Sequence, residues 1–131
     1  MRVKLALCAL ALSGCTASVQ ESQGPTKAER ELADALKGRT SGEPVDCIST
    51  MGLQGPQVID SKTVLYRESG RTVWRAELPD GCPSLRPLDT LVVEVWGAQL
   101  CRNDRFRSIT PGMSIPGAYC RFGRFTPYRK P

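Results

Sequence analysis

Cysteine is the residue type whose number and spacing in this chain point to chemistry. Four of the six cysteines, Cys47, Cys82, Cys101 and Cys120, lie in the body of the chain. No two of them have the C-x(2–4)-C spacing of a structural zinc site, and the chain has no histidine. In an exported domain an even number of cysteines predicts disulfides. Spacing does not distinguish the three pairings that four cysteines allow; we favour Cys47–Cys101 with Cys82–Cys120.

The first residues have the layout of an export signal. Arg2 and Lys4 give a positive start, and residues 5–12 form an unbroken apolar run. That run is too short to cross a bilayer, which takes about 20 residues. The next residues complete the sequence Leu-Ser-Gly-Cys at 12–15, which resembles the lipobox of bacterial lipoproteins. The resemblance implies cleavage before Cys15, a diacylglyceryl thioether on its sulfur and an acyl chain on its new amino group.

The residue types that carry most enzyme chemistry are missing or scattered. Without histidine the chain lacks the commonest general base and the usual catalytic triads. It has no G-x-S-x-G motif and no phosphate-binding glycine loop. A glycosidase-type carboxylate pair would have to come from Asp60, Glu77, Asp89 or Glu94, and nothing in the sequence brings any two of these together. We therefore expect a protein that is not an enzyme, with no catalytic residue, cofactor or metal ion.

Basic residues gather towards the C-terminus of a chain whose formal net charge is +5. Arg121, Arg124, Arg129 and Lys130 stand close together in sequence, interleaved with aromatic residues. Two interpretations are open. The arginines form a solvated face over a strand whose Phe122 and Phe125 pack inward, or they bind phosphates of an anionic envelope lipid or glycan. An export signal argues against a nucleic-acid partner.

The N-terminal part predicts a tether followed by one helix. Residues 15–25 are small, polar and aperiodic, which is typical of a flexible linker. Thr26 and Glu29 match a capping box, and apolar residues then recur at helical spacing, which predicts a helix at about 27–37. The predicted organisation is a signal peptide at 1–14, a lipidated tether at 15–25 and a single globular domain at 26–131.

The rest of the chain predicts short strands separated by glycine and proline turns. The clearest hairpin joins 63–68 to 71–78 through Ser69-Gly70, which would place Leu65 opposite Trp74 and Tyr66 opposite Val73. A nearly continuous apolar run at 91–96 predicts a central strand. Further short strands are expected at 45–49, 58–60, 105–110 and 118–122. We expect a mainly β fold, either a small β-barrel or a curved antiparallel sheet of about six short strands, with one N-terminal helix.

Three stretches together indicate a family. Gly-Arg-Thr-Ser-Gly-Glu-Pro-Val-Asp-Cys-Ile at 38–48, Gln-Leu-Cys-Arg-Asn-Asp at 99–104 and Phe-Thr-Pro-Tyr at 125–128 resemble motifs of a family of small Gram-negative lipoproteins whose function is unknown. The resemblance runs from about Leu32 to Tyr128. It implies a Gram-negative envelope and one compact exported domain, and it implies no reaction.

These observations lead to two functional hypotheses. The first is a lipid-anchored structural or binding module, held in the membrane through Cys15. Thr16, rather than aspartate, follows that cysteine, and by analogy with enterobacterial sorting this favours the periplasmic side of the outer membrane. The second hypothesis is a periplasmic inhibitor of an envelope hydrolase, because several such inhibitors are small disulfide-bonded lipoproteins.

Overall fold

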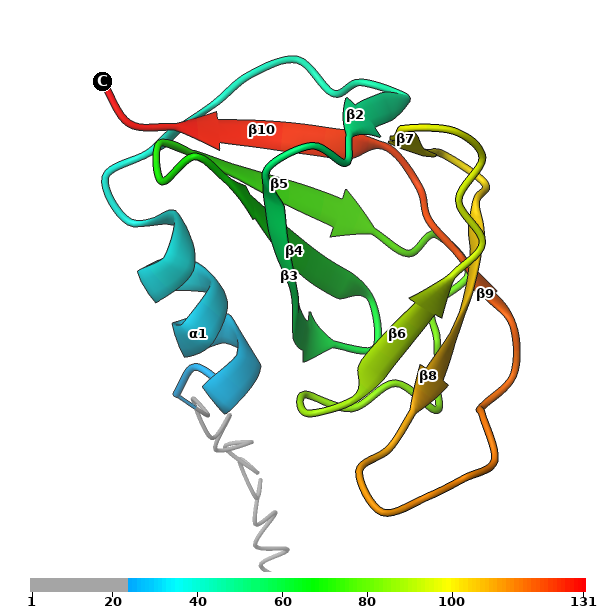
Figure 1. The fold of residues 1–131 in the computed structure, drawn as a ribbon. Helices are drawn as coiled ribbons and strands as arrows, with labels where there is room; N and C mark the ends of the chain where they lie inside the picture. The colour runs from blue at the N-terminus through cyan, green and yellow to red at the C-terminus, as the bar shows by residue number, and fades with distance from the viewer. Residues whose placement is uncertain (1–23) are drawn as a thin grey trace, which may run out of the picture.

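The computed structural model describes residues 24–131, which form one helix and ten strands in three antiparallel sheets (Figure 1). The helix is α1 (Lys27–Leu36), and the strands are β1 (Thr40–Ser41), β2 (Cys47–Ser49), β3 (Leu53–Asp60), β4 (Thr63–Glu68), β5 (Thr72–Glu77), β6 (Thr90–Val93), β7 (Gln99–Cys101), β8 (Arg105–Ile109), β9 (Cys120–Arg121) and β10 (Phe125–Arg129). The five-stranded sheet has the order β1-β10-β5-β4-β3, the small sheet has the order β6-β8-β9, and β2 pairs with β7. The mainly β fold with one N-terminal helix is confirmed, and of the two predicted forms a curved sheet fits, since no closed barrel occurs within residues 24–131.

The helix α1 begins at the predicted capping box. The Thr26 hydroxyl accepts from the backbone N–H of Glu29 at 3.2 Å, and the Glu29 carboxylate accepts from the backbone N–H of Thr26 at 2.6 Å. These hydrogen bonds to Thr26 hold the pKa of Glu29 below its usual value. At the other end Lys37 and the left-handed Gly38 (φ 69°) stop the helix one residue earlier than the sequence predicted. The one helix in residues 24–131, α1, does not have the length and apolar character that crossing a membrane requires.

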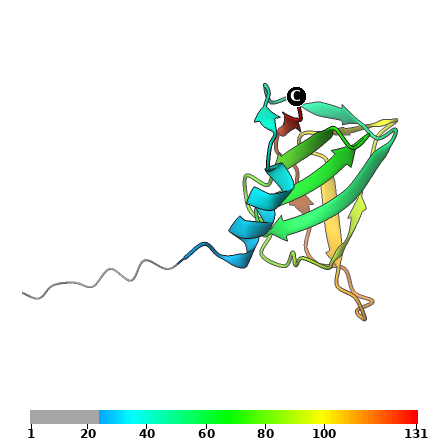
Figure 2. The same cartoon turned by 90° about the vertical axis from the view of Figure 1, so that its left-hand side faces the viewer.

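The apolar face of α1 covers one face of the five-stranded sheet (Figure 2). Leu32 and Leu36 pack with Ile59, Leu65 and Val73, which are almost fully buried. This arrangement agrees with the helical spacing of the apolar residues, because the period of the pattern sets one stripe against the sheet. The helix therefore contributes a small second core on the outer side of the five-stranded sheet.

The main core lies between the other face of this sheet and the two smaller sheets. At its centre are Phe106, Phe122 and Phe125, all fully buried. The ring centroid of Phe122 is 4.5 Å from that of Phe106 and 5.8 Å from that of Phe125. Phe122 and Phe125 thus face inward, as one of the two sequence interpretations requires. Burial of each phenylalanine contributes about 1.5–3 kcal/mol to stability.

The predicted register of the β4–β5 hairpin is wrong by one residue. Glu68 pairs with Thr72, so the connection has three residues, and Tyr66 lies opposite Trp74 rather than Val73. Ser69 and Gly70 both adopt left-handed φ values, 47° and 71°, and Arg71 is also left out of the pairing, so three residues rather than two connect the strands. The shift places Tyr66 and Trp74 together on the core-facing side.

One predicted strand differs in position from the expectation, and one strand of the structure was not predicted. The run at 91–96 is not central: β6 is an edge strand that pairs with β8 alone, and Val92 is 51% exposed between the inward-facing Leu91 and Val93. The C-terminal segment contains the strand β10, which lies between β1 and β5 and which the sequence analysis did not predict. Pro127 in the middle of β10 hides it, because proline has no N–H and argues against a central strand.

The four cysteines form two disulfides, Cys47–Cys101 and Cys82–Cys120. Cys47 lies directly opposite Cys101 in the β2–β7 pair, and their Cα atoms are 4.0 Å apart. Cys82 and Cys120 tie the loop after β5 to β9, with Cα atoms 5.7 Å apart inside the main core. Because each bridge closes a long loop, the chain-entropy model gives about 4 kcal/mol for each.

Candidate functional site

The predicted lipidation site, Cys15, lies outside the described residues, as does the signal peptide at 1–14. Within the described part of the chain the candidate site residues are the four basic residues near the C-terminus. The structure does not bring all four together. They occupy three places: β9, the start of β10 and the end of β10.

Arg121 and Arg124 are each paired with a carboxylate. Arg121 contacts the Asp80 carboxylate oxygen through Nη2 at 2.6 Å, and Arg124 contacts the Asp46 carboxylate through Nε at 3.1 Å. Arg124 also donates to the backbone carbonyl of Pro44 at 3.0 Å. Both arginines are about half exposed, so the ion pairs contribute little stability. Their charges are, however, partly neutralised on the surface that an anion would meet.

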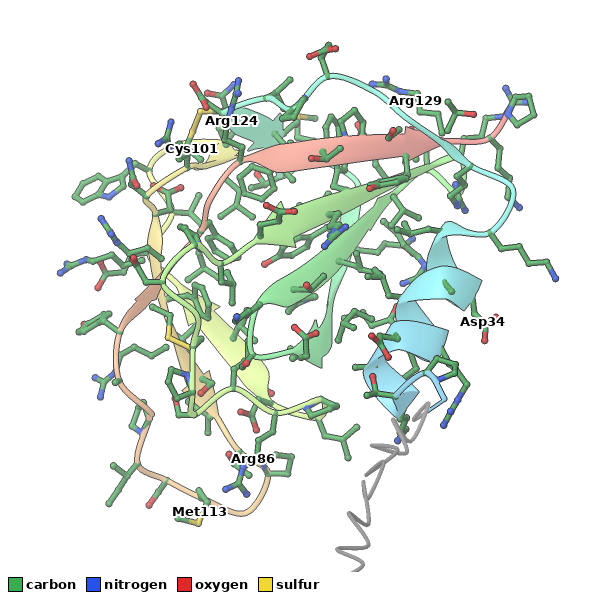
Figure 3. The ribbon with its side chains drawn as sticks, turned by 180° about the vertical axis from the view of Figure 1, so that it is seen from behind. Asp34, Arg86, Cys101, Met113, Arg124 and Arg129 are labelled. Atoms are coloured by element: carbon green, nitrogen blue, oxygen red, sulfur yellow. A yellow bond between two sulfur atoms is a disulfide. The ribbon has the colours of Figure 1, made fainter. Side chains whose placement is uncertain are left out.

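Arg129 and Lys130 lie at the far end of β10 from Arg124. Figure 3 shows Arg124 and Arg129 at opposite ends of the strand, and five residues of strand span about 17 Å. The guanidinium of Arg129 lies 5.8 Å from the ring centroid of Trp74, a cation–π distance. Residues that are neighbours in sequence are therefore separated in space by the extended strand between them.

A different group of side chains meets on the small sheet. The register of β6, β8 and β9 and the alternation along each strand bring one set of polar side chains to the side away from the core. We call this surface the outer face of the small sheet; its members are Val92, Glu94, Arg105, Arg107, Tyr119 and Arg121. The inward side of the same strands carries Leu91, Phe106 and Cys120, which belong to the main core.

Tyr119 is the centre of the outer face. The guanidinium carbons of Arg105 and Arg107 lie 4.8 Å and 5.0 Å from the centroid of its ring, and the tyrosine remains 52% exposed. Glu94 accepts from Arg105 at 2.9 Å and 3.1 Å. These contacts hold two cationic groups against one aromatic ring.

Arg107 differs from its neighbours in its partners. Its guanidinium donates to the backbone carbonyls of Gly117 at 2.9 Å and Pro116 at 3.3 Å. Carbonyl oxygens fix the orientation of the guanidinium without neutralising its charge. On the outer face Arg105 faces Glu94 and Arg121 faces Asp80, so Arg107 supplies the unneutralised positive charge of this surface.

An exposed tryptophan adjoins this face. Trp96 follows β6, makes an isolated bridge with Gln99 and is 84% exposed. The backbone N–H of Thr50 donates to the carbonyl of Ala98 at 3.0 Å. This hydrogen bond brings the turn that contains Met51 beside the turn between Trp96 and Gln99. Met51 is 76% exposed. Exposed Trp, Met, Tyr and Arg are the residue types that interfaces favour.

A hollow lies at the opposite end of β6. It is a cleft of about 670 Å³ between the start of α1, β3 and two loops, and it is lined by Lys27, Val58, Leu88, Asp89 and Pro111 among others. Asp89 is 7% exposed; one of its carboxylate oxygens accepts from the backbone N–H of Arg86 at 3.0 Å, and the other has no hydrogen-bond partner among residues 24–131.

The carboxylates considered as a catalytic pair are held separately. Each has its own partner: Lys62 N–H for Asp60, Arg75 for Glu77, Arg86 N–H for Asp89 and Arg105 for Glu94. In the part of the chain from 24 to 131, no group of three or more acidic or cysteine side chains is placed to hold a metal ion.

The sequence alone did not indicate that Tyr119, Arg105 and Arg107 form a group. Fourteen positions separate Arg105 from Tyr119, and their contact depends on the β8–β9 register, for which the sequence carries no local signal.

Comparison with known proteins gives a family and no assigned reaction. No curated protein and no solved structure matches the chain. A family model described as "Family of unknown function (DUF6491)" matches residues 1–130. The chain therefore belongs to this family.

Proposed function

We propose that this protein is a lipid-anchored envelope protein that acts as a binding module rather than as an enzyme. It is held in the outer membrane on the periplasmic side through lipid on Cys15. It recognises its partner, an anionic glycan of the envelope, through the outer face of the small sheet and the adjoining Trp96.

The anchor is supported by the sequence of the first 16 residues. A positive start, a short apolar run and the Leu-Ser-Gly-Cys sequence together fit a lipoprotein signal. Lipoprotein modification attaches three acyl chains, and each buried methylene contributes about 0.8 kcal/mol, so such a protein stays in the membrane.

The recognition surface is supported by one observation in particular: the guanidinium groups of Arg105 and Arg107 both lie against the ring of Tyr119 on the outer face. Packing does not explain these residues, since their side chains point away from the core. Arg107 and Arg105 can donate to a carboxylate or phosphate, and Trp96 offers a flat apolar surface to a sugar ring. The Cys82–Cys120 bridge fixes β9 underneath, so the surface is rigid before a ligand arrives.

Chemical cross-linking in intact envelopes tests this proposal. The Trp96→Ala, Arg107→Gln double variant should lose the cross-linked partner that the wild type recovers. Arg124→Gln is the matched control, because Arg124, like Arg107, donates to a backbone carbonyl but lies away from the outer face and is paired with Asp46. Thermal melts check that all three proteins are folded; the double variant should melt somewhat lower than the wild type, because half-buried Arg107 donates to two backbone carbonyls.

The same experiment separates the alternative function. Recovery of a single hydrolase in stoichiometric amount would support an inhibitor of an envelope hydrolase. Recovery of a glycan by the wild type and by Arg124→Gln, but not by the double variant, supports the binding module. Equal recovery of the glycan by all three proteins would contradict the surface that we propose.

A further inference from the structure

Three large apolar side chains stand exposed at one end of the molecule. Leu88 is 83% exposed, Ile115 is 76% exposed and Met113 is 60% exposed. Thr90 pairs with Ile109, so the loop before β6 and the loop after β8 lie at the same end of the small sheet. We call these two loops, residues 86–89 and 110–117, the loop end.

The chain enters the domain at this same end. Lys27, the first residue of α1, lines one cleft together with Leu88 and Pro111. Figure 1 shows the start of α1 and the connection from β8 to β9 at the same, lower end of the molecule, whereas the turn after β6 lies towards the opposite end. The described chain begins at Gly24, two residues before the helix cap.

Basic side chains accompany the apolar ones. Arg86 and Met113 line one hollow, and Figure 3 shows these two residues at the loop end. Arg86 is exposed, and Lys27 is 80% exposed, with Glu31 at 3.8 Å as its ion-pair partner. Exposed apolar side chains beside two basic ones match a bilayer surface, where acyl chains lie beneath anionic phosphates.

The distance to the anchor brings this end to the membrane. Gly24 is nine positions after Cys15, and a chain extends by at most about 3.3–3.6 Å per residue, so Gly24 stays within about 30 Å of a lipidated Cys15. A domain of this size has a radius of gyration of about 13 Å, so the reach is comparable to its diameter. The apolar tips then select which side of the domain meets the lipid.

We propose that the loop end rests on the lipid bilayer. Leu88, Met113 and Ile115 enter the boundary between headgroups and acyl chains, and Arg86 and Lys27 contact lipid phosphates. This proposal rests on the proposed lipid anchor. It adds that the domain has one fixed orientation relative to the membrane. This orientation turns the far end of β6, with Trp96, away from the membrane and towards the periplasm.

Depth-dependent fluorescence quenching tests the pose with the full lipidated chain. The protein is reconstituted in vesicles of phosphatidylethanolamine and phosphatidylglycerol that carry brominated acyl chains. The wild type has Trp96 as its exposed reporter, and Trp96→Phe with Met113→Trp moves that reporter to the loop end. Trp74 is 8% exposed and is unchanged in both proteins. Ile115→Trp in the same Trp96→Phe background is a second reporter in case the first variant does not fold.

The expected result is a blue shift and a loss of about half of the total emission for the Met113→Trp reporter, because one of its two tryptophans is in lipid. Wild-type emission should be unquenched. Vesicle-bound protein whose loop-end reporters are both unquenched would overturn the pose while leaving the anchor intact. If the protein does not stay with the vesicles at all, both the proposed lipid anchor and the proposed orientation are wrong.

Discussion

The five-stranded sheet and the small sheet differ in what covers them. The five-stranded sheet is packed on both sides, by α1 on one face and by the main core on the other. The small sheet packs on one side alone, and its outer face carries Arg105, Arg107 and Tyr119. Packing therefore accounts for the side chains of the first sheet, while those of the second need another explanation, which is why we place recognition there.

The two regions also differ in how they are held. The five-stranded sheet has long pairings, such as that of β4 with β5 over their whole lengths. The β8–β9 pairing has two residue pairs, and β2 with β7 has three. Both of these short pairings contain a disulfide cysteine, Cys120 in β9 and Cys101 in β7. We infer that the Cys82–Cys120 cross-link, rather than sheet length, is the source of rigidity under the outer face.

The largest expected effect is loss of the central core ring. Phe122→Ala should lower the free energy of unfolding by about 3–5 kcal/mol, because Phe122 is fully buried and contacts Phe106 and Phe125. Val92→Ala, on the outer face, should cost less than about 1 kcal/mol. Urea unfolding of both variants measures the difference. Similar losses would mean that the outer face is as much a part of the packing as the core.

The disulfides should follow in size. Cys82→Ala and Cys120→Ala should each lower the free energy of unfolding by about 2–5 kcal/mol, and their double variant should be hardly worse than either single variant. The same rule should hold for Cys47→Ser with Cys101→Ser. Chemical denaturation and thiol alkylation measure these effects. Additive losses within either pair would contradict the pairing in the structure.

Much of the fold follows from local signals, and the failures share a cause. The capping residues Thr26 and Glu29 were enough to locate α1, because a helix is held by contacts near in sequence. Strand pairing depends on partners far apart, so one additional turn residue after Ser69 shifted a register, and Pro127 concealed β10. The candidate site could not be predicted from local signals for the same reason. The arginines that are nearest in sequence lie apart in space, and Arg105 contacts Tyr119 across two strands.

The N-terminal cap of α1 provides a test with a smaller expected effect on stability. Thr26→Ala should lower stability by about 1 kcal/mol at neutral pH through loss of the cap. Because the folded state holds the pKa of Glu29 below its usual value of 4.5, the charged carboxylate stabilises the fold above that value, and this contribution is lost as the pH falls through the lowered pKa. The free energies of unfolding of the wild type and Glu29→Gln should therefore differ at neutral pH and converge once the pH falls below the lowered pKa of Glu29. A difference that persists in acid would show that charge is not the cause.

The smallest expected effect is on the exposed tryptophan. Trp96→Ala should change the free energy of unfolding by less than about 0.5 kcal/mol, because its side chain is 84% exposed. Thermal or urea unfolding provides the number. A loss near that of Phe122→Ala would remove the contrast between the two regions, since Trp96 would then be explained by packing.

Photo-cross-linking in intact envelopes tests the central claim, that recognition belongs to the outer face of the small sheet, most directly. A benzoylphenylalanine in place of Trp96 probes that side, and the same group in place of Lys130, which follows β10 on the five-stranded sheet, is the matched control. We predict a discrete adduct from position 96 and none from position 130. An adduct from position 130 alone, or identical adducts from both, would contradict the account and favour the C-terminal basic residues or an unspecific surface.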